Sequence, residues 1–165
     1  MIAPVLGQSP GSEVLEIVVP KRLESPNVTR GYHWRRRHRE TMAWQGLIHG
    51  HAPRMRPLWS VETNPRLAYD DRGRPYLKTD RIPERRRVTI TRLVPSRRNF
   101  IRDDDNLRFA AKPVNDALKR LGFLYDDTRT WLEQPAPVQT VDPQGRDLTV
   151  IRIERVLTPA GKAGR

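Results

Sequence analysis

The pattern of apolar and polar residues along the chain predicts four strands, and two longer amphipathic stretches predict helices. The predicted strands are rich in β-branched and apolar residues and are bounded by Pro or turn residues; they cover residues 13–19, 87–94, 137–141 and 147–156, of which 87–94 alternates well. The last two are joined by Asp142-Pro-Gln-Gly145, which favours a reverse turn and a final hairpin. The predicted helices span 34–49 and 105–121.

The helix predicted at 105–121 has two contrasting faces. At about 100° per residue, Asp105, Lys112 and Asp116 fall within about 20° of one direction. The opposite direction collects an apolar stripe that should face the core: Leu107, Ala110, Ala111, Val114, Ala117, Leu118 and Leu121. We expect Asp105 to be the N-cap and Gly122 to end the helix. Pro113 predicts either a kink or a helix that restarts there.

The helix predicted at 34–49 combines a packing face with a run of arginines. The packing face consists of Trp34, Thr41, Trp44, Leu47 and Ile48. The arginines at 35, 36, 37 and 39 spread over the remaining surface, which suits either a phosphate backbone or an ordinary solvated face. We expect the four tryptophans, at 34, 44, 59 and 131, to lie in the core rather than to stack on bases.

The segment between these elements is harder to interpret. Five prolines between 51 and 87 rule out long helices. Residues 67–77 favour a β-hairpin around an Asp-Asp-Arg-Gly turn. Strands and helices in this order indicate an α/β (α+β) domain with a mixed sheet flanked by helices. We expect one domain at 13–157, a flexible leader at 1–12 and a flexible tail at 158–165.

Composition narrows the class of protein. The 165 residues include 31 Lys and Arg against 19 Asp and Glu, a net charge of +12. Such a chain favours a polyanionic partner, with nucleic acid as the first candidate and acidic proteins as the alternative. The absence of cysteine excludes disulfides, cysteine-ligated zinc and thiol catalysis. Without an apolar run of membrane-spanning length or a signal-peptide pattern, we expect a soluble cytoplasmic protein.

Residues 102–127 carry six aspartates in this otherwise basic chain. Adjacent carboxylates repel one another, and a hard divalent cation such as Mg²⁺ would offset that repulsion. If Asp126-Asp127 returns beside the helix, Asp127 could meet Asp103 and Asp105 at one cation. The alternatives are a helix cap for Asp103–Asp105 and a plain turn for Asp126-Asp127. Asp116 is expected to pair with Lys112 or Lys119.

The ordered set formed by Asp103-x-Asp105-Asn106-Leu107, Lys112, Asp116-Ala-Leu118, Gly122 and Asp126-Asp127 resembles the signature of the RusA-type Holliday-junction resolvases. The early Ser25-Pro-Asn27 loop before a basic helix and the final hairpin resemble that family more loosely. The resemblance implies a phage or prophage homodimer with a mixed sheet flanked by helices. It also implies dependence on Mg²⁺ or Mn²⁺ and paired incisions in branched DNA.

Residue by residue, the resemblance implies that Asp103, Asp105 and Asp127 are catalytic metal ligands and that Lys112 is the essential basic residue. Asp126 takes a lesser role. The residues expected to contact DNA are Asn27, Arg30, Arg35, Arg36, Arg37, Arg97, Arg98 and Arg102. Residues 51–86 are longer than in the family. Two other functions remain open: a non-catalytic DNA-binding or regulatory protein of this fold, and an RNA-directed metal-dependent nuclease.

Overall fold

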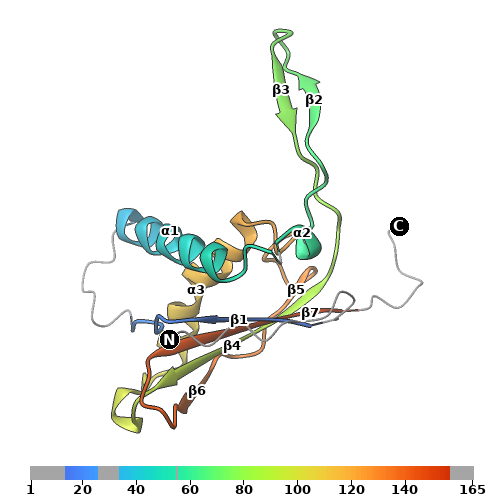
Figure 1. Ribbon diagram of the computed structural model, residues 1–165. Helices are drawn as coiled ribbons and strands as arrows, with labels where there is room; N and C mark the ends of the chain where they lie inside the picture. Colours follow the sequence, from blue (N-terminus) through green and yellow to red (C-terminus); the bar gives the residue numbers. More distant parts are fainter. Residues whose placement is uncertain (1–13, 26–33, 55, 157–165) are drawn as a thin grey trace.

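A computed structural model describes residues 14–25, 34–54 and 56–156 of the chain. Five strands form a mixed sheet, two long helices pack on it, and a separate two-stranded ribbon projects from the body (Figure 1). The elements in chain order are β1 (Val14–Val19), α1 (Trp34–His51), α2 (Arg56–Trp59), β2 (Arg66–Tyr69), β3 (Pro75–Lys78), β4 (Arg86–Val94), the 3₁₀ turn η2 (Arg97–Asn99), α3 (Asp104–Arg120), β5 (Leu132–Glu133), β6 (Val138–Val141) and β7 (Leu148–Arg155).

The predicted fold class, a mixed α and β domain with a mixed sheet, is confirmed at this level. The predicted leader at 1–12 and all of the predicted tail at 158–165 lie outside the described residues. No helix in the described ranges is both long enough and apolar enough to cross a membrane.

The sheet runs β1-β7-β4-β5, and β6 also pairs with β4. β7 is antiparallel to β4, whereas β5 and β6 run parallel to β4 along its other edge. The prediction that 137–141 and 147–156 form a hairpin is therefore wrong, because β4 lies between them. The expected turn is present, since the amide of Gly145 donates to the carbonyl of Asp142 over 2.9 Å. The Asp142 amide bonds Val94 at the end of β4, so the chain crosses that end before β7 begins.

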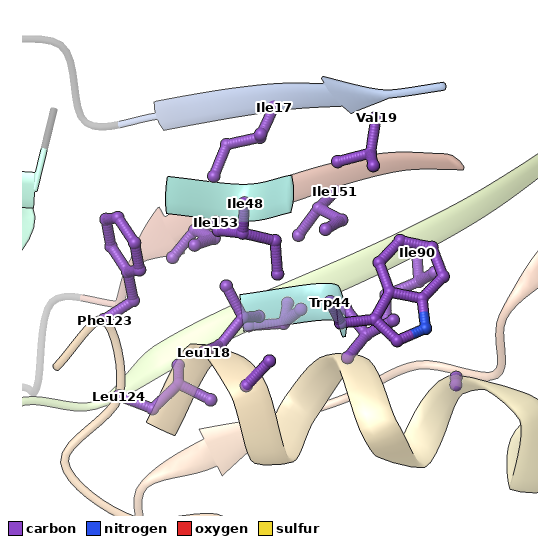
Figure 2. Packing of buried hydrophobic residues seen from close by; sticks show 14 of the residues in the cluster. Ile17, Val19, Trp44, Ile48, Ile90, Leu118, Phe123, Leu124, Ile151 and Ile153 are labelled. Carbon is purple, nitrogen blue, oxygen red and sulfur yellow. The ribbon is translucent and has the colours of Figure 1, made fainter. Parts of the chain in front are cut away.

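One face of the sheet carries the core. Leu15 and Ile17 on β1, Ile90 on β4, and Ile151 and Ile153 on β7 are all buried. Side chains of α1 and α3 pack on this face, among them Trp44, Ile48 and Leu118 (Figure 2). The alternation that predicted the strands thus results from helices covering one side only. On the opposite side Val18 remains 40% exposed.

The first helix and two of the four tryptophans agree with their predictions. Thr41, Trp44 and Ile48 of α1 are buried and Leu47 is partly buried against the core. Trp59 is also buried, while Trp131 is half-buried and packs edge-on against Tyr125. The side chain of Trp34 lies outside the described part of the chain.

The helix α3 follows its predicted stripe but begins earlier than expected. The N-cap is Asp103, not Asp105, and its carboxylate accepts the Asp105 amide. At the other end the Phe123 amide donates to Leu118 and the Gly122 amide to Lys119, a Schellman arrangement with Gly122 at φ 79°. Pro113 lies inside one continuous helix rather than at a restart. Buried residues on both sides of it, such as Leu107 and Leu118, offset the lost hydrogen bond.

The ribbon of β2 and β3 confirms the hairpin predicted at 67–77. Its turn closes with the Gly73 amide donating to the Asp70 carbonyl over 2.9 Å. The register places Leu67 opposite Leu77 and Tyr69 opposite Pro75 on one side of the ribbon. Leu67, Tyr69 and Leu77 are all more than half exposed, and the ribbon stands clear of the body (Figure 1).

Candidate functional site

Three exposed aspartates surround the first turn of α3. Asp103 caps the helix with both carboxylate oxygens, because Oδ1 accepts the Asp105 amide at 2.9 Å and Oδ2 accepts the Asn106 side-chain amide at 3.0 Å. Asp104 and Asp105 lie in the first turn, where the helix dipole favours negative charge. Capping therefore explains Asp103, whereas Asp104 and Asp105 are exposed carboxylates beyond what a single cap needs.

The second acid pair lies at the other end of α3 and is neutralised by a lysine. The Lys119 ammonium donates to Asp127 Oδ1 at 2.8 Å and also contacts Asp126 Oδ1. The hydrogen bond from Lys119 lowers the pKa of Asp126 to about 2. The same contacts, that with Asp126 first, raise the pKa of Lys119. Asp126 and Asp127 are thus both paired with one lysine.

The two acid groups do not meet within one chain. Asp105 and Lys119 are separated by about 21 Å along the helix axis. A lysine side chain extends roughly 6 Å, so the Asp127 carboxylate held by Lys119 stays roughly 8 Å or more from that of Asp105. Oxygens that share one Mg²⁺ each lie about 2.1 Å from it. Accordingly, no group of three His, Asp or Glu side chains in the described residues is placed to hold a metal ion.

The middle of the polar face of α3 differs from its predicted pairing. Lys112 is exposed on the helix surface. Asp116 pairs with Arg37 of α1 at 3.2 Å, so the prediction that it pairs with Lys112 or Lys119 is wrong. The physical reason is the packing of α1 against α3, which places Arg37 beside Asp116 while Lys119 binds the acids that follow the helix.

The predicted DNA-contacting arginines fall into two groups. Arg97 and Arg98 in η2, together with Arg102, are exposed just before the acidic end of α3. Arg35 and Arg36 are exposed at the start of α1, next to Arg37 and its Asp116 partner. Asn27 and Arg30 lie outside the described residues. The first group therefore lies before the N-terminus of α3, and the second group lies next to the pair formed by Arg37 and Asp116 in its C-terminal half.

Two arginines that the sequence interpretation missed hold the segment leading to Asp126-Asp127. Arg81 donates to the Lys119 carbonyl at 2.9 Å and to the Tyr125 carbonyl at 3.4 Å. Arg86 is fully buried, and its Nη1 donates to the carbonyls of Trp59 and Phe123 at 2.5 Å each. The signal for Arg86 was its inward position in the alternation of β4. Both side chains fix the backbone that carries the second acid pair.

The ion pair at Lys119 predicts a specific titration. In metal-free buffer, ¹³C NMR should show the Asp126 carboxyl titrating near a pKa of 2, and replacing Lys119 by Gln should return this pKa toward 3.8. Because the folded-state pKa is depressed, the stabilisation is complete above the unfolded value of about 3.9 and is lost as the pH falls toward 2. Lys112→Gln, a lysine on the same helix, is the control and should leave Asp126 unchanged. An Asp126 pKa that ignores Lys119→Gln would contradict the pairing.

No protein-family model matches the chain, and a search of curated proteins found no match to its sequence either.

Proposed function

We propose that the protein is a structure-selective endonuclease that cuts four-way DNA junctions and depends on Mg²⁺, for which Mn²⁺ can substitute. The observation that carries this proposal is the set of exposed carboxylates at the first turn of α3, directly preceded by Arg97, Arg98 and Arg102. The whole chain has a net charge of +12, which attracts the phosphate backbone of nucleic acid. The resemblance to RusA-type resolvases in residues 103–127 supports the same function.

The donor atoms suit the proposed metal. Carboxylate oxygens are hard ligands of the kind Mg²⁺ prefers, and Asp103 and Asp105 would supply them at the start of α3. When bound there, Mg²⁺ would lower the pKa of a water and stabilise negative charge at the scissile phosphate. Arg102 and its neighbours would hold the flanking phosphates, and Lys112 would present a positive charge from the exposed face of α3.

The distance between Asp127 and the pair Asp103 and Asp105 determines how a metal site with all three ligands could form. If Asp127 serves the same cation as Asp103 and Asp105, it must come from a second copy of the chain, because within one copy Lys119 holds it near the far end of α3. The protein would then act as a homodimer with two sites, one for each strand that is cut. Lys119 would hold the Asp126 and Asp127 carboxylates in place until the partner arrives.

The same separation favours one alternative function. A non-catalytic DNA-binding protein needs the arginines but no convergent acids, which is the arrangement within a single copy. The two functions differ in a simple way: the enzyme nicks junctions in Mg²⁺, whereas the alternative binds them without nicking. Nicking of RNA but not of DNA would instead indicate an RNA-directed nuclease.

A cleavage assay tests the proposal. The protein should nick a synthetic four-way junction in Mg²⁺, leave a linear duplex of the same sequence intact, and lose activity in EDTA. Asp105→Asn should abolish nicking while junction binding stays equal or becomes tighter, because the change removes one negative charge. Asp71→Asn, an exposed aspartate in the turn of the β2–β3 ribbon, is the control and should retain activity. An Asp105→Asn protein that nicks at the wild-type rate would rule this mechanism out.

A further inference from the structure

A pocket of about 520 Å³ lies beside the acidic end of α3. Its walls come from the segment after β1, from β4, and from the residues that lead into α3. We call it the arginine pocket; the lining residues used here are Arg22, Arg92, Phe100, Arg102, Asp103 and Asn106. Its volume is in the range of small-molecule sites, which is suitable for a nucleotide.

A nearly buried cation forms one wall of the arginine pocket. Arg92 is 3% exposed, and its Nε donates to the Leu23 carbonyl at 2.9 Å. Its Nη1 donates to the Asn99 carbonyl at 2.7 Å and to Gln139 Oε1 at 3.0 Å. None of the described residues accepts from its Nη2, and none supplies a carboxylate within ion-pair distance. A buried guanidinium with neutral partners has unused capacity for an anion.

A second arginine increases the positive potential of the arginine pocket. Burial lowers the pKa of Arg92 and the nearby charge of Arg22 lowers it further, while the charge of Asp147 partly offsets both effects. Arg22 itself is 44% exposed and only loosely paired with Asp147 at 3.6 Å. Two like charges on one pocket repel each other, and a phosphate between them would relieve that repulsion.

The remaining walls are of a different character. Phe100 is half-buried and lines the arginine pocket, and an aromatic side chain is of the kind on which a base can stack. The neighbouring Ile101 is held in place by a pair of hydrogen bonds with the Gln139 side chain, at 2.8 and 2.9 Å. Asp103 and Asn106, at the start of α3, close the side nearest the proposed metal ligands.

We infer that the arginine pocket binds one nucleotide of the substrate strand, with its phosphate at Arg22 and Arg92 and its base against Phe100. This inference rests on the proposed function and deepens it, because it assigns the nucleotide next to the cut a binding site of its own. Contacts to that base would make cleavage depend on the local sequence as well as on the junction.

Binding of free nucleotides tests the inference without requiring catalysis. The full chain, in metal-free buffer, is titrated with each of the four deoxynucleoside 5′-monophosphates and with inorganic phosphate, while backbone amides are followed by NMR. At least one monophosphate should shift the amides of Phe100, Ile101 and Asp103 and bind about tenfold more tightly than phosphate, since base stacking adds to the anion contact.

A matched pair of variants distinguishes nucleotide binding in the arginine pocket from non-specific attraction to a basic protein. Arg22→Gln should weaken nucleotide binding about fivefold or more. Arg152→Gln, whose side chain is similarly exposed at 50% and also borders one acid, should leave it unchanged. Equal affinity for phosphate and all four nucleotides, or equal losses in the two variants, would overturn the inference. A protein that nicks junctions but fails this test keeps the proposed function; one that passes it without nicking loses only that function.

Discussion

Mixing an Asp105→Asn protein with an Asp127→Asn protein should restore the junction nicking that neither performs alone. Each variant by itself should show no detectable nicking, because losing one ligand of the metal that stabilises the transition state should cost at least about 10²–10³-fold in rate. In a mixed dimer one site combines Asp103 and Asp105 of the Asp127→Asn chain with Asp127 of the Asp105→Asn chain. That site is intact, because each variant supplies the residue that the other lacks.

The expected recovery is limited by the statistics of mixing. At equal concentrations and free exchange, about half of the dimers are mixed and each holds one intact site, so roughly a quarter of the sites are active. Because the mixed dimer cuts one strand only, the product should be a nicked junction rather than two resolved duplexes. The assay therefore separates the nicked junction from the resolved duplexes on a native gel after incubation in Mg²⁺.

A second mixture controls for this result. Asp103→Asn mixed with Asp105→Asn should stay inactive, because both residues belong to the start of the same α3 and every site lacks one of them. Recovery of nicking in this control would mean that recovery in the first mixture does not come from combining the metal ligands of two chains. No recovery in the first mixture, with an active wild-type protein, would show that Asp127 does not complete the site across two chains.

Replacing the buried Arg86 by Met should destabilise the fold by about 3 kcal/mol, the largest stability effect that we expect. The change leaves the carbonyls of Trp59 and Phe123 without their donor and removes the 2.7 Å bond to Glu84. It also removes the cation that stacks on the Trp59 ring. Because Met fills much of the same volume, most of the loss reflects unmet hydrogen bonds rather than a cavity.

Denaturant unfolding measures this effect, with the next residue of β4 as its control. Arg87 points to the other face of the sheet, where its side chain is 49% exposed and pairs with Glu133. Arg87→Met should change the free energy of unfolding by less than about 1 kcal/mol, as expected for an exposed ion pair. Equal effects of the two substitutions would contradict a structural role for the Arg86 hydrogen bonds.

The longer elements of the fold could be predicted from the sequence, whereas the short elements α2, η2 and β5 and one strand pairing could not. Periodicity located β1, β4, β6, β7 and both long helices, and Gly122 marked the end of α3. The turn after β6 suggested a hairpin because turns usually join neighbouring strands. The order of the strands depends instead on β4, which is distant in sequence and forms hydrogen bonds with both β6 and β7. No feature of the turn itself encodes that partner.

In the candidate site, too, the residues could be predicted from the sequence but their arrangement in space could not. The acids were found because six aspartates stand out in a basic chain. Their failure to converge follows from the length of α3, which spaces Asp105 from Lys119 by about 21 Å. The buried arginines at 86 and 92 occupy inward positions in the alternation of β4. An arginine in such a position signals a hydrogen-bonded cation, but only the fold reveals the carbonyls that it meets.

The β2–β3 ribbon divides the described part of the protein into two thermodynamic units. Its strands pair only with each other there, and Leu67, Tyr69 and Leu77 lie outside the core. A two-stranded hairpin without such support is marginally stable in water. Its amides should therefore exchange with solvent through local opening, while those of β4 and β7 await global unfolding. Loss of the ribbon's order would cost the body little, so this segment can change its sequence without changing the rest of the fold.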